Sequence, residues 1–264
     1  MTNTDSFSQM ADDVAGTSPV ASFAVVVLAA GSGTRLGYGI PKAAVQHSGK
    51  TLLEWALAGV DASGVASRIV VTVPKGDTAL TKIVANYGAL TVSGGSSRAE
   101  SVALALSALD NAPVRSGFSS DAPSHVLIHD AARSFTPVEV FHRVCQSLSS
   151  GQAAVIPVLP VVDTIKTVDT DGYVRSTVQR SVLRSVQTPQ GFHLKTLLEA
   201  YRQTEQQGLN DEITDDASVA EMCGIPVKTV LGDFRSLKIT VAEDLALASA
   251  LKLADELSAV SEKD

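Results

Sequence analysis

The feature that most restricts the fold of this chain is the regular return of short apolar segments rich in β-branched residues. Each segment has the length of a strand, and stretches with helical periodicity separate them. Strands that alternate with helices form βαβ units, which place parallel strands side by side under helices on both faces. The sequence therefore predicts an α/β fold with a mostly parallel sheet, and its expected strands are Phe23–Leu28, Arg68–Val73, Ala89–Val92, His125–Ile128, Ala153–Val158 and Pro226–Leu231.

Helix starts are predicted wherever Ser or Thr is followed three residues later by Glu. In such a capping box the first side chain accepts a hydrogen bond from the third helical N–H, and the Glu reaches back to the capping residue. The four matches are Thr51 with Glu54, Ser97 with Glu100, Thr136 with Glu139 and Thr240 with Glu243.

One segment departs from the alternation of strands and helices. From Val161 to Val178, polar and apolar residues alternate around Asp169-Thr170-Asp171-Gly172, and Gly172 suits a turn position with positive φ. We expect a β-arm over about residues 161–187 that projects from the sheet. Because an isolated two-stranded arm is marginal in water, we expect it to pack against a second copy of the chain in a homodimer.

The composition is that of a globular chain, with 264 residues of which 45% are apolar and 19% are charged. We expect one domain at residues 21–258 behind a disordered tail at residues 1–20, which lacks the basic start and apolar middle of a signal peptide. The longest strongly apolar stretch, Phe23 to Ala30, is too short to cross a bilayer. No membrane span is predicted.

Charge and cysteine content narrow the partners and the compartment. A net charge of −7 argues against a nucleic-acid or anionic-membrane surface. Cys145 and Cys223 form neither a CxxC pair nor a metal-ligand cluster with the five histidines, so we expect a cytoplasmic protein without a metal site of its own. Cys145 shares a helical face with Phe141, Val144 and Leu148 and is expected to belong to the core.

The first expected strand runs directly into a loop of small residues, Ala29-Ala30-Gly31-Ser32-Gly33. Arg35 follows this loop closely, and Lys42 comes after a short connection. Glycines let backbone N–H groups approach phosphate oxygens, and the two cations neutralise the charge that remains. A nucleotide is therefore the first ligand to consider.

Two other phosphate-binding motifs are excluded by spacing. The dinucleotide fingerprint GxGxxG fails because Leu36 stands where the third glycine is required. Gly49-Lys50-Thr51 imitates the end of a Walker loop, but Ala44 stands at the position of the first glycine. These failures direct the hypothesis away from redox cofactors and NTP hydrolysis.

Further candidates follow the other strands, because ligands of open parallel sheets collect at the carboxyl ends of strands. Asp130 and Arg133 end a buried strand, where a charged pair needs partners or a ligand. The remaining candidates are Gly94–Ser101, Asp163–Lys166, Arg180, Thr188–Gln190, Asp215, Asp216 and Lys238.

Several of these candidates have a simpler alternative interpretation. Arg98 and Ser101 lie in the first turn of an expected helix and are compatible with solvent exposure. Lys238 alternates with apolar neighbours, as a lysine does on the exposed face of a strand. Asp215 and Asp216 fit an acidic first helical turn that interacts favourably with the helix dipole.

Taken in order, the candidate segments resemble a known family. The segments are LAAGSGTRLG with PK, GGSSRAES, HDAAR, DTIK, TPQGF, ITDDAS and LKIT. Together they resemble the 2-C-methyl-D-erythritol 4-phosphate cytidylyltransferase family of the non-mevalonate isoprenoid pathway, over about residues 23–250. The chain departs from the family pattern at Ser134, where Pro is common, and at Ser96, where Asp is frequent. The resemblance implies a Rossmann-like domain whose β-arm interlocks two subunits.

The resemblance also implies an activity, the transfer of CMP from CTP to 2-C-methyl-D-erythritol 4-phosphate with release of pyrophosphate. Mg²⁺ would be held mainly by the CTP phosphates, and Arg35, Lys42 and Arg180 would be catalytic. Residues that would hold CTP are Ala29, Ala30, Gly31, Gly33, Arg35 and Lys42, with Gly95, Ser96 and Ser101 facing the cytosine and ribose. Residues that would bind the sugar-alcohol phosphate are Asp130, Arg133, Thr164, Thr214 and Lys238, with Arg180 and Thr188 reaching the site of the neighbouring subunit.

The expected mechanism is a direct in-line attack, because the acceptor phosphate is already a competent nucleophile and needs only alignment and charge stabilisation. No covalent intermediate is expected. Two alternatives remain open: a cytidylyltransferase for ribitol 5-phosphate or another sugar phosphate, and a non-catalytic nucleotide-binding regulator.

Overall fold

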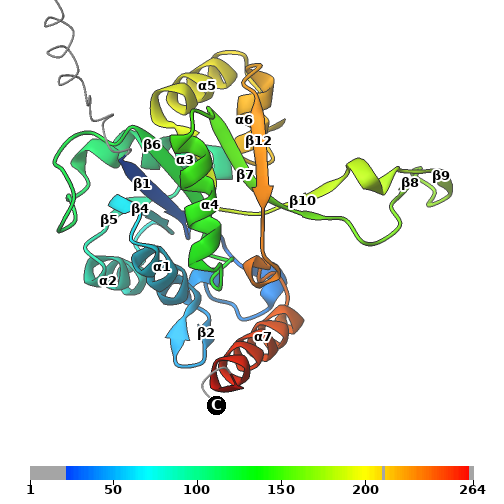
Figure 1. The fold of residues 1–264 in the computed structure, drawn as a ribbon, viewed down its shortest axis with the longest axis horizontal. Coiled ribbons are helices and arrows are strands. Elements are labelled where there is room, and N and C mark those ends of the chain that lie inside the picture. Colours follow the sequence, from blue (N-terminus) through cyan, green and yellow to red (C-terminus); the bar gives the residue numbers. More distant parts are fainter. Residues whose placement is uncertain (1–21, 210–211, 262–264) are drawn as a thin grey trace, which may run out of the picture.

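An eight-stranded, mostly parallel sheet forms the centre of the molecule (Figure 1). The computed structural model describes residues 22–209 and 212–261, so the predicted tail at residues 1–20 lies outside the described residues. The sheet order is β10-β7-β11-β6-β1-β4-β5, with β12 also paired to β7. Its strands are β1 Phe23–Leu28, β4 Ala66–Val73, β5 Leu90–Ser93, β6 His125–Asp130, β7 Ala154–Pro160, β10 Arg184–Val186, β11 Gln190–His193 and β12 Val227–Leu231.

Parallel pairing joins β1 to both β4 and β6, β4 to β5, and β7 to β12. Strand β11 runs antiparallel between β6 and β7, and β10 runs antiparallel to β7. The predicted α/β class and mostly parallel sheet are therefore confirmed. The carboxyl ends of β1, β4 and β6 lie at one edge of this sheet, where a ligand site is expected.

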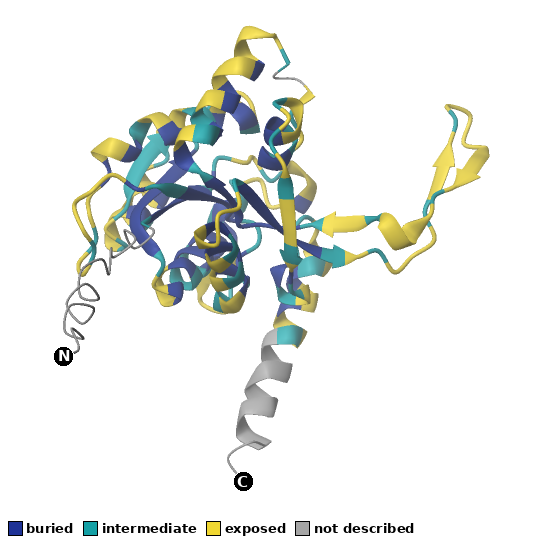
Figure 2. Cartoon of the chain, turned by 45° about the horizontal axis from the view of Figure 1, so that its top comes forward, coloured by how far each residue is buried: buried dark blue, intermediate teal, exposed yellow. Residues whose placement is uncertain are grey.

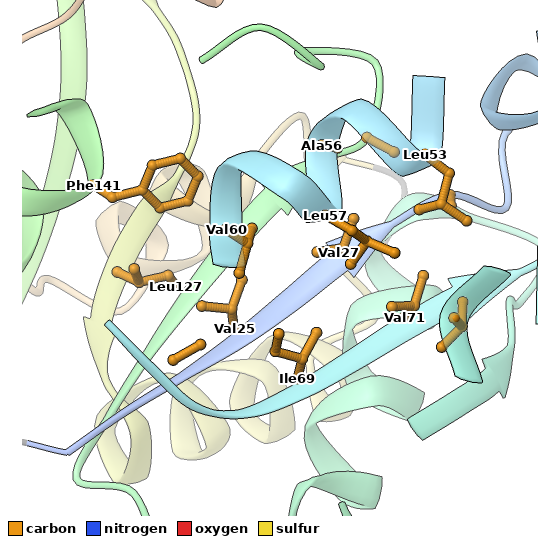
Figure 3. Packing of buried hydrophobic residues seen from close by; sticks show 14 of the residues in the cluster. Val25, Val27, Leu53, Ala56, Leu57, Val60, Ile69, Val71, Leu127 and Phe141 are labelled. Atoms are coloured by element: carbon orange, nitrogen blue, oxygen red, sulfur yellow. The ribbon is translucent and has the colours of Figure 1, made fainter. Parts of the chain in front are cut away.

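Helices cover both faces of the sheet because side chains of β1 alternate between two cores. Val25 and Val27 pack with α1 (Leu52–Ser63), α2 (Thr78–Asn86) and α4 (Val138–Ser149), as Figure 3 shows in part. On the other face, Ala24 and Val26 lie in a second core cluster. The helices of this second face are α3 Arg98–Ala108, α5 Leu194–Gln206 and α6 Asp216–Met222.

The remaining elements are short, apart from one terminal helix. Helix α7 (Ala242–Ser261) packs Leu245 and Ala248 against Leu52 and Ile239. No helix in the described part of the chain has both the length and the apolar character needed to cross a membrane. The short elements are η1 Thr34–Leu36, η2 Lys42–Ala44, β2 Gln46–His47, β3 Lys50–Thr51, β8 Lys166–Val168, β9 Val174–Thr177, η3 Leu109–Asn111, η4 Arg180–Val182 and η6 Phe234–Ser236.

The predicted capping boxes are confirmed at the start of α1 and only in part at α3. Thr51 caps α1 and Glu54 reaches back to it, as expected. Ser97 caps α3 by accepting a hydrogen bond from the Glu100 N–H, but the Glu100 carboxylate accepts hydrogen bonds from Ser96 instead of Ser97.

Two other capping boxes are wrong. Pro137 precedes the first residue of α4, and the Thr136 hydroxyl donates to the Arg133 carbonyl. Before α7, the Asp244 carboxylate accepts hydrogen bonds from the backbone N–H groups of Thr240 and Val241. Asp244 thus takes the capping role that was expected of Thr240 with Glu243. A single carboxylate one turn into the helix satisfies the same free N–H groups.

The β-arm projects far from the body of the molecule and is largely exposed (Figures 1 and 2). Strands β8 and β9 pair only with each other, and β10 then returns the chain to β7. At the tip, Gly172 has φ of 86°, as the turn requires. The Asp169 carboxylate accepts hydrogen bonds from the N–H groups of Asp171 and Tyr173, which closes this turn.

Candidate active site

A cavity of about 440 Å³ opens at the predicted edge of the sheet. Leu28 at the end of β1, Thr72 near the end of β4 and Asp130 at the end of β6 form its base. The rest of its wall comes from the loops after these strands and from the start of α3: Ala29–Ser32, Arg35, Lys42, Ala43, Gly95–Ser97, Arg98, Ser101, Ala131, Ala132 and Lys238.

The glycine loop places Lys42 on the cavity wall. The Lys42 N–H donates to the Gly31 carbonyl at 3.3 Å, which holds the two segments together. Gly33 has φ of +70°, and a Cβ there would lie 2.9 Å from the Cβ of Lys42. Gly33 is not among the residues that line the cavity. Its role is structural, because only glycine combines this backbone conformation with so close a neighbour.

Lys42 and Arg35 form the cationic side of the cavity. Neither makes an ion pair with a carboxylate among the residues that the structure describes. Burial, together with repulsion from Lys238 and Arg35, lowers the pKa of the Lys42 ammonium. Because a bound anion would relieve this repulsion, the wall is suited to a phosphate group.

The loops after β1 and β5 lie close together beside the cavity. Gly94 is so close to Ala30 that a Cβ on Gly94 would lie 2.3 Å from the Ala30 Cβ. The buried Ser101 hydroxyl accepts from the Gly95 N–H at 3.1 Å and donates to the Ser97 carbonyl at 2.8 Å. The alternative of a solvent-exposed Ser101 is therefore wrong, and this hydroxyl holds the second loop in place.

Ser96 is fixed by the start of α3. Its N–H and its hydroxyl both donate to the Glu100 carboxylate, each at 2.6 Å. These hydrogen bonds from Ser96 lower the pKa of Glu100. Because the hydroxyl proton is already donated, Ser96 retains only acceptor capacity toward a ligand.

Opposite charges alternate along the other side of the cavity. The Lys238 ammonium lies 2.7 Å from one carboxylate oxygen of Asp130, and the Arg98 guanidinium lies 3.6 Å from the other. Arg98 also pairs with Asp216 at 2.6 Å. Burial alone would raise the pKa of Asp130, but Arg98 and Lys238 lower it to about 2, so this carboxylate is ionised.

In the described part of the chain, two cations without an ion pair thus lie beside a network of ion pairs. Comparison of the chain with known proteins agrees with this arrangement. The family model described as 2-C-methyl-D-erythritol 4-phosphate cytidylyltransferase matches residues 23–253. The chain belongs to this family. It is accordingly a nucleotidyltransferase enzyme, and the resemblance based on its motifs is confirmed.

Relatives and solved structures of the family extend over most of the chain. A cytidylyltransferase of this name from Rhodococcus jostii is 43% identical over 226 residues, which are 86% of this chain and 93% of the relative. The one from Saccharopolyspora erythraea is 44% identical and covers 87% of this chain and 99% of the relative. The crystal structure of the Thermus thermophilus cytidylyltransferase matches with a TM-score of 0.71 at 35% identity, covering 87% of this chain and 98% of that one.

Ten of the predicted site residues line the cavity of this family member: Ala29, Ala30, Gly31, Arg35, Lys42, Gly95, Ser96, Ser101, Asp130 and Lys238. The structure brings them together from four separate segments of the chain. Lys238 is exposed, as its simpler alternative expects, but it belongs to no strand and pairs with Asp130.

Thr188 lies inside its own subunit. It is 4% exposed, and its hydroxyl accepts from the Asp130 N–H at 3.1 Å and lies 3.0 Å from His129 Nδ1. Burial lowers the pKa of His129 to about 4, so the ring is neutral and shares a hydrogen bond with the Thr188 hydroxyl. The expectation that Thr188 reaches the site of a neighbouring subunit is corrected, because this buried side chain supports Asp130 of its own chain.

Arg133 joins two segments behind the cavity instead of lining it. Its guanidinium donates to the Ser236 carbonyl at 2.7 Å and to the Val186 carbonyl at 3.0 Å. Burial lowers the pKa of the Arg133 guanidinium. The groups that accept its two hydrogen bonds are neutral carbonyls. In this structure Arg133 therefore braces the loop that contains Lys238, which differs from the direct substrate contact expected of it.

Three further predicted residues lie outside the cavity. Thr164 and Arg180 are exposed on the β-arm, where Arg180 donates to the Val162 carbonyl. Thr214 is exposed just before α6, and its N–H donates to the Ser218 hydroxyl. The structure of a single subunit does not bring these three residues to the other site residues.

Two charged candidates that the sequence left without an assigned role belong to the site. Arg98 lines the cavity and pairs with the buried Asp216, so the solvent-exposed alternative is wrong for Arg98. Asp216 does lie in the first turn of α6, as its alternative expects, but it also holds Arg98. A signal was present in the sequence. Asp216 precedes Val219 and Ala220 by three and four residues, a spacing that puts all three on the buried face of α6.

Proposed function

We propose that this chain transfers CMP from CTP to 2-C-methyl-D-erythritol 4-phosphate, giving 4-diphosphocytidyl-2-C-methyl-D-erythritol and pyrophosphate. The observation that supports this reaction best is the division of one cavity into two sides. Within the described part of the chain, Lys42 and Arg35 have no carboxylate partner and suit a triphosphate. Asp130 and Lys238 instead form a pair that suits a ligand with both hydroxyl and phosphate groups.

The reaction requires alignment more than covalent participation by the protein. An oxygen of the acceptor phosphate attacks the α-phosphorus of CTP and forms a new P–O bond. The bond from the α-phosphorus to the bridging oxygen breaks, and pyrophosphate leaves with the electron pair. Because charge increases on the equatorial oxygens and the leaving group, the two cations Lys42 and Arg35 would stabilise the transition state.

The close spacing of the loops after β1 and β5 favours a pyrimidine over a purine. The close approach of Gly94 to Ala30 limits the space between the two loops. Ala29, Gly31, Gly95 and Ser101 would face the nucleotide through small side chains and backbone groups, which leaves the base edge to be recognised by fixed donors and acceptors.

Mg²⁺ is the cation that we propose for the reaction, and the donor set of the cavity agrees with a metal held by substrate. Among the described residues, no group of three or more His, Cys, Asp or Glu side chains is placed to hold a metal ion. Asp130, the acidic residue of the cavity wall, is already paired with cations. Bound to the CTP phosphates, Mg²⁺ would neutralise charge on the triphosphate.

The acceptor side of the site is proposed to need a second subunit. Apolar side chains on the arm are exposed, which favours burial against a partner; they are Val162, Val168, Tyr173, Val174 and Val182. A homodimer through the arms would carry Thr164 and Arg180 to the cavity of the partner, where Arg180 would position the acceptor phosphate. Arg133 would support this side indirectly, by holding the loop that contains Lys238.

We also infer a cytoplasmic location for the reaction. Cys145 and Cys223 are free thiols, as expected in a reducing compartment. Burial raises the pKa of Cys145 to about 12, which makes it unreactive.

An assay of pyrophosphate release tests the proposed function. The full chain is incubated with CTP, Mg²⁺ and either 2-C-methyl-D-erythritol 4-phosphate or ribitol 5-phosphate, and ATP replaces CTP in a parallel reaction. We expect release with CTP and the methylerythritol phosphate only. Release with ribitol 5-phosphate at a higher kcat/KM would assign the chain to the alternative acceptor, and no release with either would favour the regulator.

A further inference from the structure

Five side chains from five parts of the chain form a continuous polar cluster beside the acceptor side of the cavity. We call it the Arg98 cluster: Tyr201, Asp216, Arg98, Asp130 and Lys238. The Tyr201 hydroxyl donates to Asp216 at 2.7 Å, and Asp216 holds Arg98 at 2.6 Å. Arg98 and Lys238 then approach Asp130 at 3.6 and 2.7 Å.

Asp216 is held rigidly, although no role is assigned to it so far. It has no exposed surface, and it lies at the first position of α6. Gln190 of β11 fastens this end of the helix, because its amide accepts from the Ala217 N–H at 2.9 Å and donates to Asp215 at 2.7 Å. The position of the Asp216 carboxylate is therefore set by the sheet and by Tyr201.

Arg98 has the means to move onto Asp130 if Asp216 does not hold it. The nitrogen that pairs with Asp216, Nη2, is the same one that lies 3.6 Å from Asp130. The other terminal nitrogen, Nη1, is buried and has no hydrogen-bond partner among the described residues. A guanidinium released from Asp216 would form a bidentate ion pair with the Asp130 carboxylate, because this is the geometry in which Arg binds a carboxylate best.

Such a pair would remove Asp130 from its role at the acceptor side. The carboxylate has two oxygens, of which one is close to Lys238 and the other is only loosely approached by Arg98. A carboxylate that must accept hydrogen bonds from substrate hydroxyl groups needs this second oxygen. Occupation of both oxygens by Arg98 would also release Lys238 from its present place.

We propose that Asp216 is a positioning residue for the acceptor: by holding Arg98, it keeps the Asp130 carboxylate available to Lys238 and to the hydroxyl groups of the bound sugar-alcohol phosphate. This inference rests on the proposed function of the same cavity. The charges agree with it, because Asp216 and Asp130 balance Arg98 and Lys238, and the loss of one carboxylate leaves two cations to share the other.

The test is a steady-state comparison of wild type, Asp216→Asn, Arg98→Gln and the double variant, with separate KM values for CTP and for 2-C-methyl-D-erythritol 4-phosphate. Asp216→Asn should raise the KM of the acceptor about tenfold and change the KM of CTP by less than about twofold. In the double variant the acceptor KM should return most of the way toward that of wild type, because no guanidinium remains to occupy Asp130.

A matched control removes an exposed carboxylate from the same helix. Glu221→Gln leaves the contacts of Asp216 intact, and its acceptor KM should stay close to that of wild type. Thermal unfolding of each variant reports whether it folds. If Asp216→Asn does not fold, Tyr201→Phe provides the test, because it removes only the hydroxyl that orients Asp216 and should raise the acceptor KM about twofold.

The outcomes separate this inference from the proposed function. Wild type without turnover would overturn the proposed function and this inference with it. An active wild type with an unchanged acceptor KM in Asp216→Asn, or in Tyr201→Phe where that variant replaces it, would overturn the inference alone. The same holds if Arg98→Gln and Asp216→Asn multiply in the double variant, because Arg98 would then contribute to acceptor binding independently of Asp216.

Discussion

The cavity at the sheet edge and the β-arm differ in how much of their structure a single chain supplies. Around the cavity, buried strand ends, the Gly33 contact and the Arg98 cluster place every wall residue by interactions within one subunit. The arm has mainly its own ladder between β8 and β9, and Tyr173 at its tip is 72% exposed. The cavity can therefore form in a lone subunit, whereas the contribution that we propose for the arm depends on a partner.

This contrast separates two kinds of site residue that look alike in the sequence. Lys42 and Arg180 are both basic residues next to a short 3₁₀ turn, but only Lys42 faces the cavity of its own chain. Substitutions at the cavity should impair every subunit that contains them. Substitutions on the arm should impair the subunit beside them.

The largest effect is expected from removal of the unpaired cations. Lys42→Ala and Arg35→Ala should each lower kcat about 10²- to 10³-fold, because a fixed positive charge near the transferred phosphorus is lost. Pyrophosphate release at saturating CTP measures this. Lys75→Ala, which removes a lysine from an exposed turn far along the sequence from the glycine loop, serves as the control. Near-normal turnover of Lys42→Ala would contradict the assignment of the cationic wall.

The buried ring of His129, next to Asp130 in β6, should also make stability depend on pH. The pKa of His129 is lowered by burial from 6.5 to about 4, so at pH 5 the unfolded chain binds a proton that the folded protein does not. The free energy of unfolding should therefore fall by about 2 kcal/mol between pH 7 and pH 5 from this group.

Urea unfolding at both pH values measures this dependence. The change of unfolding free energy with pH should be clearly smaller in His129→Gln than in wild type, because glutamine does not titrate. An equal change in both proteins would show that groups other than His129 cause the pH dependence of the unfolding free energy.

A substitution on the arm should have a smaller effect on turnover, and exchange of subunits should partly restore the lost activity. Arg180→Ala should lower kcat/KM about tenfold. When Arg180→Ala and Lys42→Ala proteins are mixed and allowed to exchange subunits, mixed dimers contain one site with neither substitution. About a quarter of the wild-type activity should then return. No recovery despite demonstrated exchange would place both residues in the same subunit's site.

The smallest effect is expected at the arm tip. Asp169→Ala removes the carboxylate that accepts from Asp171 and Tyr173, and should speed hydrogen exchange of the Tyr173 amide while the thermal midpoint stays within about 1 °C of wild type. Asp77→Ala is the matched change in the body, where the carboxylate caps α2, and should cost about 1 kcal/mol. A midpoint lowered equally by both would show that the arm and the body unfold together.

Much of the fold was predictable because β-branched runs and helical periodicity act locally. All six expected strands are present with small shifts at their ends, and the arm lies where the alternating segment predicts it. The capping box at Thr240 was wrong because Asp244, one turn into the helix, provides an equivalent acceptor. Local patterns identify a helix start more reliably than the side chain that caps it.

The site was predictable only where a motif concentrates its residues. The glycine loop, Arg35 and Lys42 lie within a short stretch, and the loop chemistry indicates a phosphate. Arg98 and Asp216 are far apart in sequence, and each alone resembles an ordinary charged residue in a first helical turn. Their pairing follows from which helices share a face of the sheet, and this depends on strand order more than on local sequence.

The two residues of the Asp130–Lys238 salt bridge are made at very different times during synthesis, because they lie far apart in the sequence. The glycine loop and β6 emerge from the ribosome long before the segment that contains Lys238. At about 5–20 residues per second, residue 238 follows residue 130 after about 5–20 s. For that interval the nascent chain contains Asp130 without Lys238, so this ion pair beside the cavity can form only after most of the described residues have been made.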